Sequence, residues 1–173
     1  MIEYTKQILK GQFEAALCML NQGVVACPPE HWENKIANAT FRWVTYHTLF
    51  FVDFYLSPSE HQFMLRELHQ HGGDERGPDL NPGLSQQESV EYLTICHQKM
   101  LDTLAAETRE SLEGESGFSY RQFSRGELHL YNIRHVQHHT GQLSAYLRRI
   151  DDLSNRDALP WIGTGWRSKV GNG

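Results

Sequence analysis

The sequence has few cysteines and lacks the long hydrophobic runs that mark several protein classes. Its three cysteines include no C-x-x-C pair, and an odd number without that spacing favours a reducing compartment over a disulfide framework. The most apolar run, "WVTYHTLFFVDFYL", is too short to cross a bilayer and contains a histidine and an aspartate. The N-terminus has no signal-peptide core. We therefore expect a cytoplasmic protein that does not bind a membrane.

An excess of basic residues is also missing. Sixteen lysines and arginines stand against 21 aspartates and glutamates, which gives a net charge of −5. No basic stripe is available to neutralise phosphates, so we expect no nucleic acid as a partner. Hydrophobic residues make up 39% of the chain, an ordinary share for a globular protein. At 173 residues, the chain is predicted to be one domain, residues 1–173, with its own core.

Internal repeats, low-complexity tracts and strand alternation are absent, and apolar residues recur instead at helical spacing. The predicted fold is all-α, a four-helix bundle with a long connection over residues 57–84 and an irregular C-terminal tail. "SQQE" and "SRGE" are capping boxes that predict the starts of the third and fourth helices. In the tail, Trp161 and Trp166 predict partial docking on the bundle. The predicted helices span residues 5–22, 32–56, 85–104 and 124–150, with a short one at 60–69.

Histidine is unusually abundant, with ten residues, three of them within "HVQHH". Residues four apart on a helix share a face, so His135 and His139 form a chelating pair, whereas His138 lies well around the helix. Such a pair also occurs on plain helix surfaces. His47 lies among aromatic residues of the second helix, where it is either a third ligand or a core histidine bonded to a carbonyl. The other histidines that we expect at the surface or at helix ends are His31, His61, His69, His71 and His97.

Spacing excludes several familiar sites. A zincin protease needs H-E-x-x-H, but Val136 and Gln137 follow His135. A ferritin-like di-iron site needs Glu-x-x-His, and no histidine has a glutamate three residues before it. No G-x-S-x-G elbow is present either. Three imidazoles from two helices would instead form an open metal site of the catalytic type.

The pattern resembles the DinB/YfiT-like family of small metal-binding four-helix bundles. The resemblance rests on a histidine in the middle of the second helix, His47, and on H-x-x-x-H followed by G-Q and an apolar residue, here "HVQHHTGQL". It implies up-down-down-up connectivity, frequent homodimers, and a divalent metal bound by His47, His135 and His139 with water completing the shell. Many members carry arginine directly after the second histidine of the motif, where this chain has Thr140.

The resemblance implies more than one activity. Some relatives look like thiol S-transferases, in which the metal holds a low-molecular-weight thiol as a thiolate, and others resemble metal-dependent hydrolases or isomerases. Our first hypothesis is a metal-dependent, thiol-activating transferase. The alternatives are a non-catalytic, metal-stabilised dimeric module for stress response or interaction, and a metal-free bundle. Three imidazoles suit zinc or nickel, with iron or manganese as further candidates.

Further polar residues are candidates to support the metal. Asn132 and Gln142 lie three residues from a ligand on a similar face and could orient an imidazole or a bound water. Ordinary helix polarity explains these two equally well. The candidates to flank the ligands or to line the pocket are His138, Tyr131, Asp53 and Tyr46.

Overall fold

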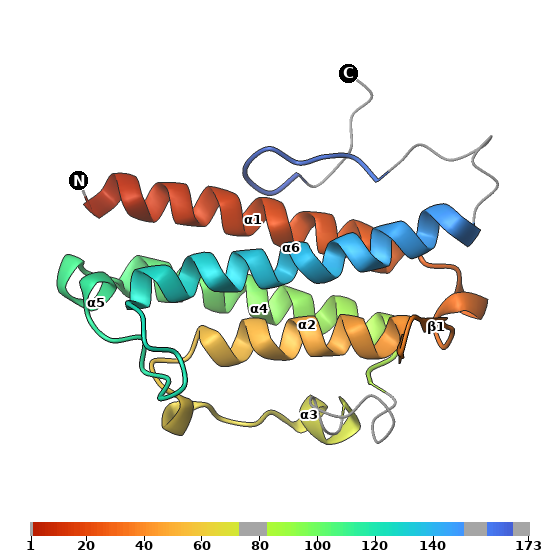
Figure 1. Cartoon of the computed structure of the whole chain (residues 1–173), viewed down its shortest axis with the longest axis horizontal. Helices are drawn as coiled ribbons and strands as arrows, with labels where there is room; N and C mark the ends of the chain where they lie inside the picture. Colours follow the sequence, from red (N-terminus) through yellow and green to blue (C-terminus); the bar gives the residue numbers. More distant parts are fainter. Residues whose placement is uncertain (1, 73–82, 151–158, 168–173) are drawn as a thin grey trace.

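Four long helices form the body of the protein in the computed structural model, which describes residues 2–72, 83–150 and 159–167 (Figure 1). Helices α1 and α6 run in one direction and α2 and α4 in the other (Figure 1), which confirms the predicted up-down-down-up bundle. Both α1 and α2 pack against α4 and α6, so α1 and α2 lie on a diagonal. The bounds are α1 (Ile2–Ala26), α2 (Phe41–Tyr55), α4 (Gln86–Ala106) and α6 (Arg125–Ile150).

The second long helix begins nine residues later than predicted. The segment before it folds as a 3-10 turn and a small antiparallel hairpin, in which Ala37 adopts a left-handed φ of 72°. Thr40 ends the hairpin and caps α2, because its side chain accepts a hydrogen bond from the Trp43 N–H. Trp32 is buried but is not helical, so the helix-like spacing of apolar residues in this segment was misleading. These elements are η1 (Pro29–His31), β1 (Lys35–Ile36) and β2 (Ala39–Thr40).

Other helix boundaries follow local chemistry. The predicted stop at Gln22 is wrong: α1 continues to Ala26, because one glycine at position 23 costs a helix only about 1 kcal/mol, and the chain reaches proline only at Pro28. The two predicted capping boxes are present, with Ser85 bonded to Glu88 and Ser124 bonded to Glu127. The predicted helix at 60–69 is two short elements. These and α5 are η2 (Glu60–Gln62), α3 (Glu67–Gly72) and α5 (Arg109–Glu113).

The described part of the C-terminal tail docks on α1 and α4. Ile162 is buried beside α1, and the Trp166 ring stacks on His97 of α4 with ring centroids 4.6 Å apart. Docking through Trp166 is therefore confirmed, but Trp161 is 77% exposed. Among the described residues, no helix combines the length and the apolar character that crossing a membrane requires.

The loop between α5 and α6 depends on Gly117, which has a φ of +85°. A Cβ at this position would lie 2.2 Å from the Pro58 carbonyl oxygen. We expect Gly117→Ala to lower the free energy of unfolding by about 1–3 kcal/mol, measured by urea denaturation. The backbone strain at positive φ and the steric clash with the Pro58 carbonyl both destabilise the fold. Gly141→Ala is the control, since its Cβ would meet nothing within 4 Å, and it should be neutral or stabilising. Equal effects of the two changes would contradict this account.

Candidate metal centre

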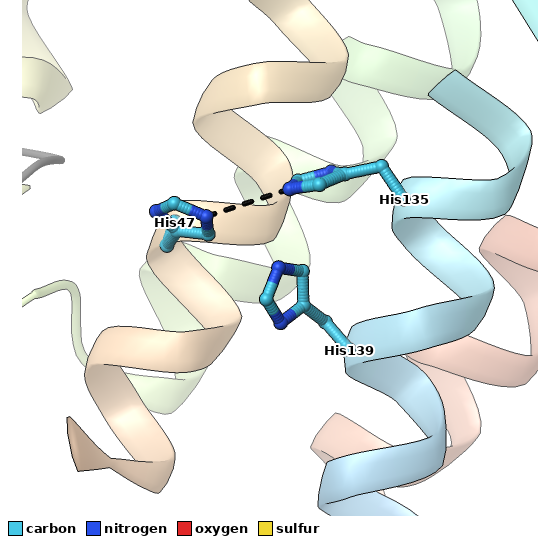
Figure 2. Close-up of side chains that lie close together, drawn as sticks. All are labelled: His47, His135 and His139. Atoms are coloured by element: carbon cyan, nitrogen blue, oxygen red, sulfur yellow. Dashed lines mark hydrogen bonds between the residues drawn. The ribbon is translucent and has the colours of Figure 1, made fainter. Parts of the chain in front are cut away.

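Three histidines from two helices meet at the seam between α2 and α6. His47 comes from α2, and His135 and His139 lie one turn apart on α6, with all three rings turned toward one another (Figure 2). The Nε2 atoms of His47 and His135 are 3.4 Å apart. One potential ligand atom from each histidine lies within 4.8 Å of the other two. The predicted pair and the histidine that is remote in sequence therefore form one group, which could hold a metal ion.

The seam leaves this group partly exposed. The fully buried face of α6 is formed by neighbours such as Asn132 and Val136, whereas His135 and His139 lie beside that face and are half-buried. His47 is also half-buried, although most of α2 is buried. Ligands partly open to solvent are typical of a catalytic rather than a structural metal site, because a substrate must reach the metal.

Aromatic rings from α2 flank the group on both sides along the helix. The Trp43 ring stacks on His47, with centroids 4.7 Å apart and an interplanar angle of 26°. One turn beyond His47, the Phe51 ring lies 4.8 Å from His47 and 5.6 Å from His135. These rings therefore pack against the imidazoles on two sides and restrict their orientation.

Burial keeps the α6 pair neutral. It is the largest cause that lowers the pKa of His135 to about 2 and that of His139 to about 4, and the neighbouring histidines lower both further. Gln142 Oε1 lies 2.8 Å from His139 Nδ1. Because an amide oxygen only accepts, His139 carries its proton on Nδ1 and presents the Nε2 lone pair. Neutral imidazoles with a set tautomer are ready to bind a metal without losing a proton.

The donor set fits a divalent metal. Two nitrogens at about 2.1 Å from a tetrahedral zinc lie roughly 3.4 Å apart, the separation of the His47 and His135 Nε2 atoms. Imidazole nitrogen is a ligand for zinc, nickel, iron and copper, and is less suited to magnesium or calcium. The group, as described, contains no carboxylate, so a bound ion would keep its net positive charge and would attract a further anionic ligand.

The residues predicted to support the metal take up different positions. Gln142 contacts His139 directly. His138 is exposed, with its ring centroid 5.0 Å from that of His139. Asn132 is buried, but it donates to the Val52 carbonyl 3.3 Å away and forms no hydrogen bond to the three ligands.

Asp53 and Tyr46 lie away from the three histidines. Asp53 is fully buried on the α4 side of α2, where it pairs with Arg66 at 2.8 Å and with Lys99 at 2.6 Å. Burial raises its pKa, but these two cations outweigh that effect and hold the pKa below its usual value. Tyr46 is a fully buried core residue whose ring packs on Phe50. Both residues therefore stabilise the bundle.

The burial of two histidines was not predicted from the sequence. His69 was expected at the surface or at a helix end. It lies in the short helix α3 but is only 5% exposed, because the 57–72 segment folds over Asp53 and brings its Nε2 within 2.7 Å of the Tyr92 hydroxyl. His129 is fully buried and bonded to Glu107 at 2.8 Å. Neither burial has a local sequence signal, since both partners are remote in sequence. Of the other histidines expected at the surface or at helix ends, His61 is exposed, His31 and His97 are half-buried, and the side chain of His71 lies outside the described residues.

A comparison with protein families identifies the family of the chain. The family model for the DinB superfamily matches residues 12–143, a range that includes all three histidines. The chain belongs to the DinB superfamily. No curated protein and no solved structure gave a significant match. In this DinB-superfamily protein, the position after the second motif histidine is Thr140, which is buried and whose Oγ1 has no hydrogen-bond partner among the described residues.

Neutral histidines make the metal-free DinB-superfamily protein sensitive to acid. In the unfolded chain these imidazoles take up protons below about pH 6.5, whereas in the fold His135 and His139 resist protonation. Stability should therefore fall as pH decreases from 6.5, on the order of 1 kcal/mol for each histidine at pH 5. Urea denaturation at pH 7.5 and pH 5 measures this loss. The double variant His135→Asn/His139→Asn should lose less, and an equal loss would refute the assignment.

Proposed function

We propose that this protein is a metal-dependent enzyme that activates a low-molecular-weight thiol for transfer to an electrophile. The observation that carries the proposal is the convergence of three imidazoles, from His47, His135 and His139, within 4.8 Å at a partly exposed seam. A bound divalent cation would stabilise the anionic form of a thiol and so supply a strong nucleophile near neutral pH. Zinc or nickel suits this donor set.

The chain's own residues have separate parts in the proposed reaction. His47, His135 and His139 would hold the ion, and Gln142 orients His139 through the hydrogen bond to Nδ1. Trp43 and Phe51, which pack on His47, restrict water around the reacting sulfur. In the transfer, the thiol proton passes to solvent, and the new sulfur–carbon bond forms as the electrophile's bond to its leaving group breaks.

Cobalt substitution provides the test, because the ion reports on its ligands by absorbance. Adding a small thiol to the cobalt-loaded full chain should produce a new near-ultraviolet band from sulfur bound to cobalt. The same preparation should then consume a model electrophile with release of its leaving group. His139→Ala, loaded under the same conditions, should show neither signal.

Three other results would each reject the thiol-transfer proposal. Cobalt binding without a thiol band would favour the hydrolase or isomerase alternative, which uses bound water. A thiol band without turnover of any electrophile would favour a non-catalytic, metal-stabilised module. Failure to bind any divalent ion would favour a metal-free bundle.

A further inference from the structure

Arg121, in the loop between α5 and α6, carries a positive charge that no acidic side chain among the described residues pairs with. Its Nη2 donates to the Tyr131 hydroxyl at 2.7 Å and to the Tyr55 hydroxyl at 3.3 Å. Within the described residues, no carboxylate lies within ion-pair distance of Arg121, and its Nε is buried without a hydrogen-bond partner. Most other half-buried or buried cations in that part of the chain have such a partner, for example Arg125 with Glu107. Nη1 has no hydrogen-bond partner among the described residues, so the guanidinium keeps donor capacity there for a ligand.

The tyrosines hold this guanidinium without cancelling its charge. The Arg121 guanidinium carbon lies 4.6 Å from the Tyr131 ring centroid and 4.9 Å from that of Tyr120. Burial raises the pKa of the Tyr55 and Tyr131 hydroxyls, so both stay neutral near pH 7. A fixed arginine among neutral hydroxyls is a common arrangement for recognising an anionic group, because the fork of N–H donors is already oriented.

Arg121 is connected to the histidine group through Tyr131 and Tyr55. Tyr131 precedes His135 by one turn of α6, and Tyr55 follows Phe51 by one turn of α2; one turn is about 5.4 Å along a helix. The rings form a continuous set of contacts, because Tyr55 lies 5.5 Å from Tyr131 and 5.4 Å from Phe51, which contacts His135. After burial and the neighbouring histidines, the charge of Arg121 is a further cause that lowers the His135 pKa.

We propose that Arg121 binds a carboxylate of the thiol substrate while the sulfur faces His47, His135 and His139. The substrate class is then a small thiol acid. The one-turn offset between Tyr131 and His135, about 5.4 Å along α6, guides the choice of a three-carbon spacer for the probe. This inference rests on the proposed function. Glu60 and Glu115 line the same cavity of about 640 Å³ as Arg121, and their negative charges disfavour a carboxylate in that cavity.

A matched pair of thiols tests the proposal. The cobalt-loaded full chain is titrated with 4-mercaptobutyrate and with its neutral amide, and the sulfur-to-cobalt band gives each affinity. We expect the acid to bind at least about tenfold more tightly, the size of a charge-assisted hydrogen bond. In Arg121→Gln the ratio should approach one, with amide affinity and cobalt content unchanged. Arg121→Lys should keep part of the preference, and it serves as the test if Arg121→Gln does not fold.

Arg148→Gln is the matched control, because Arg148 is an exposed arginine in the last turn of α6; it should behave as the wild type. The proposal is overturned if the wild type binds acid and amide equally, or if Arg121→Gln keeps the preference. It is also overturned if Arg148→Gln removes the preference as fully as Arg121→Gln does.

A thiol-free pair separates this inference from the proposed function. Succinate and succinamate each offer one carboxylate to the ion, and they differ only at the far end, as carboxylate or amide. If no thiol produces the cobalt band but succinate binds more tightly than succinamate, and Arg121→Gln removes that difference, the thiol function fails and the anion site stands. If the thiols bind without any dependence on Arg121, the anion site fails and the thiol function stands. If neither pair binds, both proposals fail.

Discussion

Replacing His47 with alanine should abolish tight binding of a divalent cation. We expect an affinity loss larger than the roughly 10–100-fold cost of removing a group that merely orients a ligand. The reason is that His47 is the contribution of α2 to the group, so the variant keeps only the His135–His139 pair from one helix. Elemental analysis of untagged protein gives the metal content, and competition with a chromophoric chelator gives the affinity.

His138→Ala is the control for that experiment. His138 is adjacent to His139 in sequence, but it is exposed and lies outside the group of three. Its loss should leave metal content unchanged, whereas His139→Ala should behave like His47→Ala. Full metal content in His47→Ala, or an equal loss in His138→Ala, would show that the three-histidine assignment is wrong.

The sequence contained enough to predict the bundle and two of the three residues in the histidine group. Helical geometry alone separates His135 and His139 from His138, because only the first two share a face. His47 could not be assigned in that way. A histidine among aromatic residues is equally compatible with a core position, and the family resemblance was needed to choose. The capping boxes at Ser85 and Ser124 were predictable because both partners of each box are local.

What could not be predicted depends on contacts between distant segments. The hairpin before α2 places apolar side chains at intervals that look helical, and only packing separates the two interpretations. No local sequence pattern marked Arg121 as a candidate binding residue, because its tyrosine partners come from two different helices. Buried ion pairs also leave no local sequence signal: Asp53, a candidate to line the pocket, pairs with Lys99, 46 residues away along the chain.

Glu107→Gln should destabilise the fold more than Gly117→Ala does. Glu107 is buried, and it accepts hydrogen bonds from Arg125 Nε at 2.9 Å and from His129 Nε2 at 2.8 Å. Burial opposes its ionisation, but His129, Ser111 and Arg125 outweigh that cost and lower its pKa to about 2. The carboxylate is therefore charged, and glutamine would leave the buried Arg125 without a counter-ion. Breaking such a pair costs about 3–5 kcal/mol, measurable as the free energy of unfolding in urea.

The loss of stability in Glu107→Gln would involve more than one contact, because Arg125 also binds the end of α2. Its Nη1 and Nη2 atoms also donate to the carbonyls of Tyr55, Leu56 and Ser57, at the C-terminal end of α2, where a positive charge stabilises the helix dipole. The control is Glu113→Gln, which removes an exposed pair with Arg109 and should cost at most about 0.5 kcal/mol. If Glu107→Gln cost no more than this control, the hydrogen bonds to the α2 carbonyls alone would stabilise the charged Arg125. Glu107 would then contribute hydrogen bonds but no essential charge.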